Sequence, residues 1–91
     1  MMQLSDFIGQ PCNSRIAFEF LPKQKQQLKL QEIADKLRLT NVFVEVETPF
    51  LLMLKVAGHN ISFFRSGKII VKDTNDKAEA RKVAEALLKE L

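Results

Sequence analysis

The chain has 91 residues, of which 46% are hydrophobic and 27% are charged. This length indicates one domain, and the hydrophobic share excludes an intrinsically disordered protein. No stretch approaches the roughly 18 apolar residues of a membrane-spanning helix, and we expect neither a signal peptide nor a membrane partner. The net charge of +3 is compatible with a nucleic-acid partner without requiring one. The single cysteine, Cys12, excludes a disulfide within the chain and is typical of the reducing cytoplasm, where we expect the protein to act.

The first part of the chain is expected to contain one strand. Residues 1–14 are predicted to be irregular, because Gly9 and Pro11 interrupt any regular element. A half-buried strand is predicted from Ile16 to Leu21, where large apolar residues alternate with smaller or polar ones. Pro22 ends this strand because it cannot donate a backbone hydrogen bond to a neighbour.

Two segments have the periodicity of amphipathic helices. Apolar residues three and four positions apart predict a helix from Leu30 to Leu39. The residues from Val42 to Glu47 then alternate, as a short strand or an extended connection. Near the end of the chain, an N-cap within residues 73–76, with Glu79 as its capping-box partner, begins a second helix from Lys77 to Leu91.

Between these helices, three antiparallel strands are predicted, over residues 50–56, 61–65 and 68–72. A turn at residues 57–60 joins the first two, and a tight Ser66–Gly67 turn joins the last two. In the middle strand, one apolar face opposes a mixed face that is available to a partner. That mixed face consists of Asn60, Ser62, Phe64 and Ser66. This order of elements predicts a two-layer α+β sandwich.

Four motifs follow one another in a characteristic order. They are Leu28-Lys-Leu-Gln-Glu-Ile-Ala34, Glu47-Thr-Pro-Phe50, Phe64-Arg-Ser-Gly-Lys68 and the alanine-rich helix that begins at Lys77. In this order the chain resembles one half of the saddle domain of the TATA-box-binding protein family. The resemblance covers residues 15–91 and implies a curved antiparallel sheet with two helices packed on one face.

In that family, two such halves form a saddle whose concave face lies in the DNA minor groove, where phenylalanines wedge between base steps. The resemblance therefore implies that Phe64 and Phe50 are wedges and that Lys68 contacts a phosphate. Alternation places Lys72 on the same face, where our hypothesis makes it a second phosphate contact. It places Asn60, Ser62, Ser66 and Ile70 on the same concave face, with Arg15, Ala17 and Glu19 beside them. Because side chains alternate between the two faces of a strand, a strand that begins with Phe50 on this face would also place Leu52, Leu54 and Val56 on it.

The chain departs from the family in having one half instead of two. A complete saddle would need a homodimer, which we expect to pair edge to edge through the strand from Ile16 to Leu21. Glu19 would face phosphate-rich DNA, an unfavourable placement by charge. Specific recognition of a TATA sequence is therefore not expected.

No constellation of residues indicates catalysis, a metal or a cofactor. One histidine and one cysteine cannot form a metal-ligand set, and Glu45 and Glu47 lack a basic partner. Our first hypothesis is a non-catalytic module that binds double-stranded DNA or another nucleic acid as a homodimer. The alternative is a protein-interaction module that uses an apolar patch of Leu52, Leu54, Phe64 and Ile70. From the resemblance alone, we expect that the protein comes from a prokaryote, and specifically from an archaeon.

Overall fold

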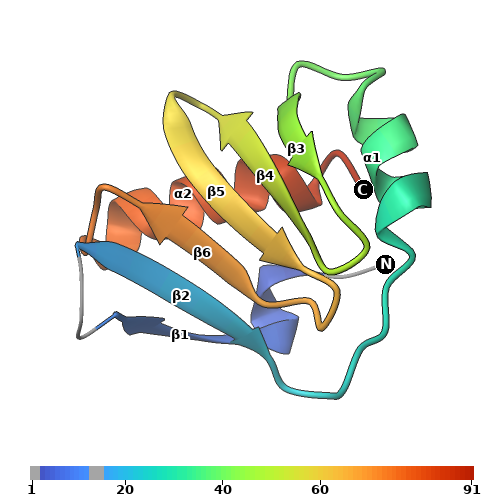
Figure 1. The fold of residues 1–91 in the computed structure, drawn as a ribbon. Coiled ribbons are helices and arrows are strands. Elements are labelled where there is room, and N and C mark those ends of the chain that lie inside the picture. The colour runs from blue at the N-terminus through green and yellow to red at the C-terminus, as the bar shows by residue number, and fades with distance from the viewer. Residues whose placement is uncertain (1–2, 13–15) are drawn as a thin grey trace.

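One open antiparallel sheet forms the centre of the computed structural model, which describes residues 3–12 and 16–91 (Figure 1). Its strands lie in the order β1-β2-β6-β5-β4-β3. Their bounds are β1 Phe7–Pro11, β2 Ala17–Pro22, β3 Phe43–Glu47, β4 Leu51–Val56, β5 His59–Phe64 and β6 Ile69–Lys72. The helices are a short 3-10 turn, η1 (Leu4–Asp6), and the α-helices α1 (Leu30–Leu37) and α2 (Lys77–Leu88). The fold is therefore α+β, as the pattern of elements predicted.

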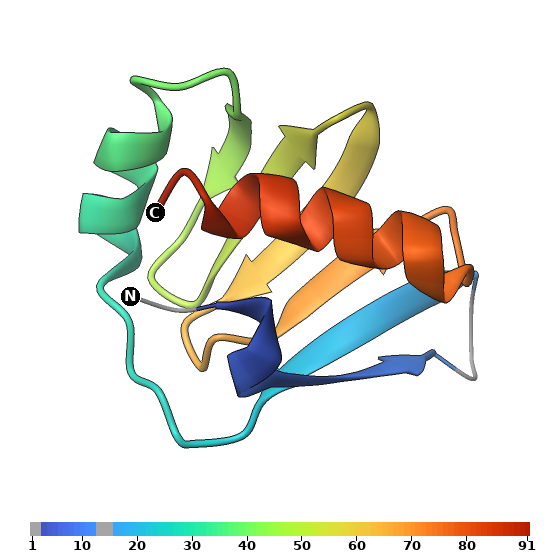
Figure 2. The same cartoon turned by 180° about the vertical axis from the view of Figure 1, so that it is seen from behind.

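The two faces of the sheet have different surroundings. Helix α2 crosses one face, which we call the helix face, and α1 packs beside β3 and β4 (Figure 2). No helix of the described residues covers the other face, which we call the open face (Figure 1). Strand pairing and alternation place on the open face Ile8, Gln10, Ala17, Glu19, Leu21, Phe43, Val46, Leu51, Met53, Lys55, Asn60, Ser62, Phe64, Ile70 and Lys72.

A single hydrophobic core lies between the helix face and the helices. The apolar stripe of α2 supplies Ala80, Val83, Ala84, Leu87 and Leu88, and that of α1 supplies Leu30, Ala34 and Leu37. These residues pack against inward side chains of the strands because both helices repeat apolar residues at three- and four-residue intervals. An ion pair between Arg38 and Glu47, 2.7 Å apart, also ties the end of α1 to β3.

The prediction that residues 1–14 are irregular is wrong, because Phe7–Pro11 forms the edge strand β1. Gly9 is required there for packing. A Cβ atom at this position would lie 2.8 Å from the ring of Phe20 and 2.9 Å from that of Phe18. Proline is tolerated in an edge strand because such a strand forms backbone hydrogen bonds with a neighbour on one side only. The two residues that indicated a break are thus compatible with a strand at the sheet edge.

The predicted homodimer through the strand from Ile16 to Leu21 is also wrong in its geometry. That strand is β2, which pairs with β1 on one side and β6 on the other. Its backbone therefore has no free edge for a second copy.

Most other elements form close to their predicted bounds. The alternating segment that begins at Val42 is the strand β3, with a register shift between Val44 and Val46. The prediction of a capping box at the start of α2 was only partly right. Asp76 is the N-cap and accepts a hydrogen bond from the backbone of Ala78, but the Glu79 carboxylate lies 2.9 Å from the imidazole of His59.

The turn between β4 and β5 is shorter than predicted and consists of two residues in left-handed conformations. Ala57 has φ = 51° and Gly58 has φ = 80°. This is the geometry of a two-residue hairpin turn that favours Asn-Gly. Ala57 is therefore strained, whereas Gly58 is well suited.

We predict that Ala57→Asn raises the free energy of unfolding by roughly 0.5–1 kcal/mol, because asparagine tolerates the left-handed region better than alanine. Gly58→Ala should lower it by about 1 kcal/mol. No atom lies within 4 Å of a Cβ at Gly58, so this matched variant tests backbone conformation without a clash. Urea unfolding of both variants checks the prediction, and equal stabilities would contradict it.

Candidate functional site

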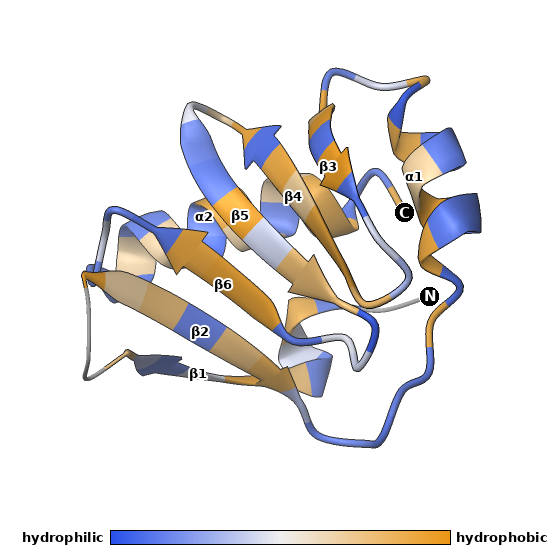
Figure 3. Cartoon of the chain, in the orientation of Figure 1, coloured by the Kyte–Doolittle hydropathy of each residue, from blue (hydrophilic) through white to orange (hydrophobic). Residues whose placement is uncertain are grey.

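The open face divides into an apolar part and a charged part. On β3 and β4, Phe43 is 62% exposed and Val46 43% exposed, and the half-buried Leu51 and Met53 lie beside them. Toward β6 and β2, the side chains include lysines and a glutamate. Figure 3 shows hydrophilic segments at the start of β5 and across the middle of β2, within otherwise hydrophobic strands. A bare sheet face with exposed apolar and basic groups is suited to a macromolecular partner.

Two aromatic rings, each with a cation over it, stand at one end of this sheet. The guanidinium carbon of Arg65 lies 5.4 Å from the ring centroid of Phe50. The ammonium nitrogen of Lys68 lies 5.5 Å from the ring centroid of Phe64. Both separations are within the range of cation–π attraction. We call Phe50, Phe64, Arg65 and Lys68 the aromatic–cation cluster.

Backbone hydrogen bonds hold the cluster together. The amide of Arg65 donates to the carbonyl oxygen of Phe50, and the amide of Phe64 donates to that of Lys68, both at 2.9 Å. The predicted tight turn is present and includes Arg65 as well as Ser66 and Gly67, because Phe64 and Lys68 form its closing pair. Gly67 has φ = 93°, which favours glycine, and its amide donates to the carbonyl oxygen of Phe64.

Glu19 lies on the open face next to this cluster. Its carboxylate accepts a 2.7 Å hydrogen bond from the side-chain amide of Gln10 and lies 3.4 Å from the ammonium of Lys68. The hydrogen bond from Gln10, assisted by the charge of Lys68, lowers the pKa of Glu19, although burial opposes the shift. The acidic residue that conflicted with a phosphate-rich partner is therefore paired with a lysine.

The predicted site residues differ in how much of each side chain is exposed on the open face. Phe64, Asn60 and Lys72 are half-buried on the open face. Ser62 and Ile70 also point to this face but are only 6% and 7% exposed, so they offer a partner little surface.

The remaining predicted site residues lie at or beyond the strand ends. Phe50 precedes β4 and is 64% exposed, and Ser66 is exposed in the turn. Lys68 is half-buried. Arg15 lies outside the described residues, and Ala17 is fully buried.

The placement of Leu52 and Leu54 on the open face is wrong, and so is that of Val56. Leu52 and Leu54 have no exposed surface and belong to the core, and Val56 packs in the same core. Phe50 lies outside β4, so alternation counted from Phe50 assigns the residues of β4 to the wrong face of the sheet. Pairing of Leu51 with Phe64 instead places Leu51, Met53 and Lys55 on the open face. The apolar patch expected for a protein partner must therefore consist of other residues.

Sequence reasoning missed Arg65, Gln10 and the apolar residues of β3. The arginine was visible within the Phe64-Arg-Ser-Gly-Lys68 motif, but its position over Phe50 depends on the pairing of two strand ends. Gln10 belongs to a strand that was not expected. Phe43 and Val46 share a face only because of the register shift in β3, which breaks the two-residue alternation.

Both edges of the sheet carry features that oppose pairing with another strand. The outer strand β1 contains Gly9 and Pro11, and the outer strand β3 contains a register shift and two glutamates, Glu45 and Glu47. Proline, charge and bulges at edge strands all disfavour edge-to-edge association. The open face is therefore the better candidate for a partner than either edge.

No group of three or more possible metal ligands exists within residues 3–12 and 16–91. In that same part of the chain, no helix is long and apolar enough to cross a membrane. Comparison with protein-family models, curated proteins and solved structures gave no match. The interpretation of function therefore depends on the geometry of the open face.

We predict that Glu19 titrates below the ordinary glutamate pKa of about 4.3 in the folded protein. Ionised Glu19 then stabilises the fold above this pH, and the contribution is lost as the pH falls through the folded-state pKa. The difference in unfolding free energy between the parent protein and Glu19→Gln should accordingly shrink from about pH 6 to about pH 3. Urea unfolding at each pH measures it.

The matched control is Gln10→Ala, which removes the main cause of the shift and should raise the pKa of Glu19. Carboxyl-carbon NMR titration follows this group directly in both proteins. A Glu19 pKa at or above the ordinary value in the parent protein would contradict the prediction.

Proposed function

We propose that this protein is a non-catalytic nucleic-acid-binding module that uses the open face of its sheet. The observation that carries the proposal is the aromatic–cation cluster at one end of a face that no described helix covers. Aromatic rings provide stacking surfaces for bases, and cations beside them are suited to phosphates. The cluster combines both in one place.

The charges of the open face support this proposal. Lys55, Lys68 and Lys72 lie on this face, and its Glu19 is already paired with Lys68. The face therefore has an excess of positive charge, which attracts a polyanion at long range. Phe50 and Arg65 extend this basic and aromatic region to the start of β4.

The finer interpretation of the fold, half of a TATA-box-binding-protein saddle, remains part of this proposal. It is supported by the Phe64-Arg-Ser-Gly-Lys68 turn at the end of the sheet and by α2 lying across the opposite face. On this interpretation the ligand is duplex DNA, with Phe50 and Phe64 as wedges. A homodimer would need a contact other than β2. The reducing cytoplasm remains the proposed compartment, because of the single cysteine.

A protein partner is the second candidate, and the apolar part of the open face favours it. Phe43 and Val46 are exposed on β3, where Phe43 pairs with Lys55 toward the end of β4 that is distant from Phe50 and Val46 pairs with Met53. A protein that covered this part would bury apolar surface with little dependence on salt, whereas nucleic-acid binding weakens steeply as salt rises.

We predict that Phe50→Ala weakens nucleic-acid binding about fivefold or more, because a stacked base contributes roughly 1–3 kcal/mol. Phe43→Ala is the matched control, since the two rings are 64% and 62% exposed and lie toward opposite ends of β4. Fluorescence anisotropy with a labelled single strand and with AT-rich and GC-rich duplexes, at about 50 and 200 mM salt, measures both variants.

Lysine variants test the electrostatic part of the same prediction. Lys72→Gln should reduce the slope of log affinity against log salt by about 1, whereas Lys82→Gln, exposed on α2, should leave it unchanged. Absence of binding at low salt would overturn the proposal. A loss of binding to a protein partner in Phe43→Ala alone would favour the second candidate.

A further inference from the structure

The segment that joins β2 to α1, residues 23–29, is rich in basic residues, and we call it the basic connection. It contains Lys23, Lys25 and Lys29, together with three glutamines and one leucine, and no acidic residue. All three lysines are exposed. Figure 1 shows this segment running past the end of the sheet where the turn between β5 and β6 lies. The basic connection is therefore at the same end of the sheet as the aromatic–cation cluster.

Direct contacts join the basic connection to the turn that contains Arg65. The amide of Leu28 donates a 2.9 Å hydrogen bond to the carbonyl oxygen of Arg65. A Cβ atom at Gly67 would lie 3.1 Å from Cγ of Pro22 and 3.2 Å from Cγ of Gln26. Glycine at this position therefore allows the turn to pack closely against the segment, in addition to its φ of 93°.

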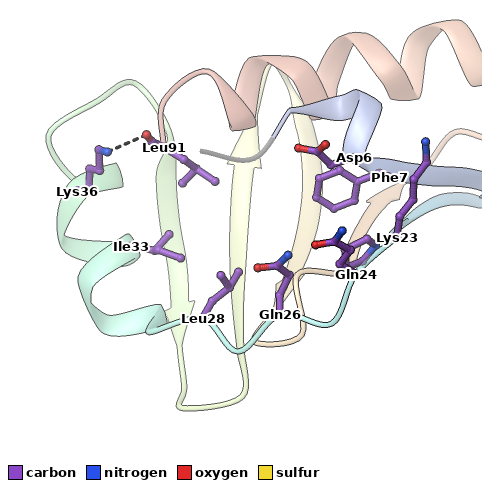
Figure 4. Close-up of a pocket in the computed structure, with 10 residues that line it drawn as sticks. Asp6, Phe7, Lys23, Gln24, Gln26, Leu28, Ile33, Lys36 and Leu91 are labelled. Atoms are coloured by element: carbon purple, nitrogen blue, oxygen red, sulfur yellow. Dashed lines mark hydrogen bonds between the residues drawn. The ribbon is translucent and has the colours of Figure 1, made fainter.

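The backbone of the basic connection is held near both of its ends. At its start, the amide of Lys23 donates a 2.8 Å hydrogen bond to the carbonyl oxygen of Asp6, so an acidic residue lies close to this first lysine. Near its end, Leu28 is bonded to the turn. Figure 4 shows the segment between these two points, with Gln24 and Gln26 along it. A backbone that is already held loses less conformational entropy when its side chains bind a ligand.

Two cations in this region have no carboxylate beside them. Within residues 3–12 and 16–91, no ion pair involves Lys25 or Arg65. Lys29, by contrast, lies 3.8 Å from Glu32, and Lys23 follows the acidic residue to which its amide is bonded. Lys25 and Arg65 are therefore the groups of this region whose positive charge is most available to an anion.

We infer that the basic connection is a second wall of the nucleic-acid site, where Lys25 and Arg65 bind phosphates of a strand whose base stacks on Phe50. A guanidinium has five N–H donors and an ammonium has three, and both groups suit phosphate oxygens. A nucleic acid is the class of ligand that uses phosphate-binding cations and an exposed ring together. This inference rests on the proposed function and extends the site from the open face to the end of the sheet.

The salt dependence of binding tests this wall, with the labelled single strand and duplexes described above. Lys25→Gln should reduce the slope of log affinity against log salt by about 1, because one phosphate contact is lost. Lys82→Gln is the matched control, since Lys82 lies on α2 at the opposite face of the sheet, and it should leave the slope unchanged. Both lysines are exposed, so neither variant removes a core contact.

Backbone amide NMR of the parent protein locates the contact. Addition of the single strand should shift the amide resonances of Lys25, Gln26 and Gly67, which belong to the two sides of the proposed wall. The amide of Lys82 should not shift.

The outcomes separate this inference from the function on which it rests. If Phe50→Ala and Lys72→Gln weaken binding but Lys25→Gln has the slope of the parent protein, the inference is overturned and the proposed function stands. Unshifted amides at Lys25 and Gln26 in the presence of bound nucleic acid would also overturn the inference alone. Absence of any binding at low salt would overturn both.

Discussion

Two rows of apolar side chains across the three central strands support the rest of this structure. Ile61 of β5 pairs with Leu54 and Val71, and Phe63 of the same strand pairs with Leu52 and Ile69. All six are buried beneath the helices. Because neighbouring residues of a strand point to opposite faces, a shift by one residue would expose these rows and bury the polar ones. The core contacts therefore also determine which residues remain on the open face.

The N-terminal strand β1 changes how the protein can meet a partner. It covers the edge of β2, and its residue Gln10 holds the carboxylate of Glu19. A sheet that began at β2 would have offered a free edge and a Glu19 carboxylate without its hydrogen bond from Gln10. With β1 in place, the outer strands are poorly suited to pairing, and the open face carries the accessible aromatic and basic groups.

The placement of the acidic residues gives the two sides of the sheet different electrostatic character. Glu47 pairs with Arg38, and Glu79 lies against His59, both on the helix side. Glu19, on the open face, is paired with Lys68. The open face therefore carries Lys55 and Lys72 in addition to this ion pair.

The sequence by itself determined the elements whose signals are local. Periodicity predicted both helices and the strands β2, β4, β5 and β6, and it left the segment of β3 as either a short strand or an extended connection. It also placed Asn60, Ser62 and Phe64 together on one face. Tertiary structure decided what depends on pairing between distant segments. It made a strand of Phe7–Pro11, placed Leu52 and Leu54 in the core, and brought Arg65 over Phe50. These outcomes follow from register and edge position, which local alternation does not contain.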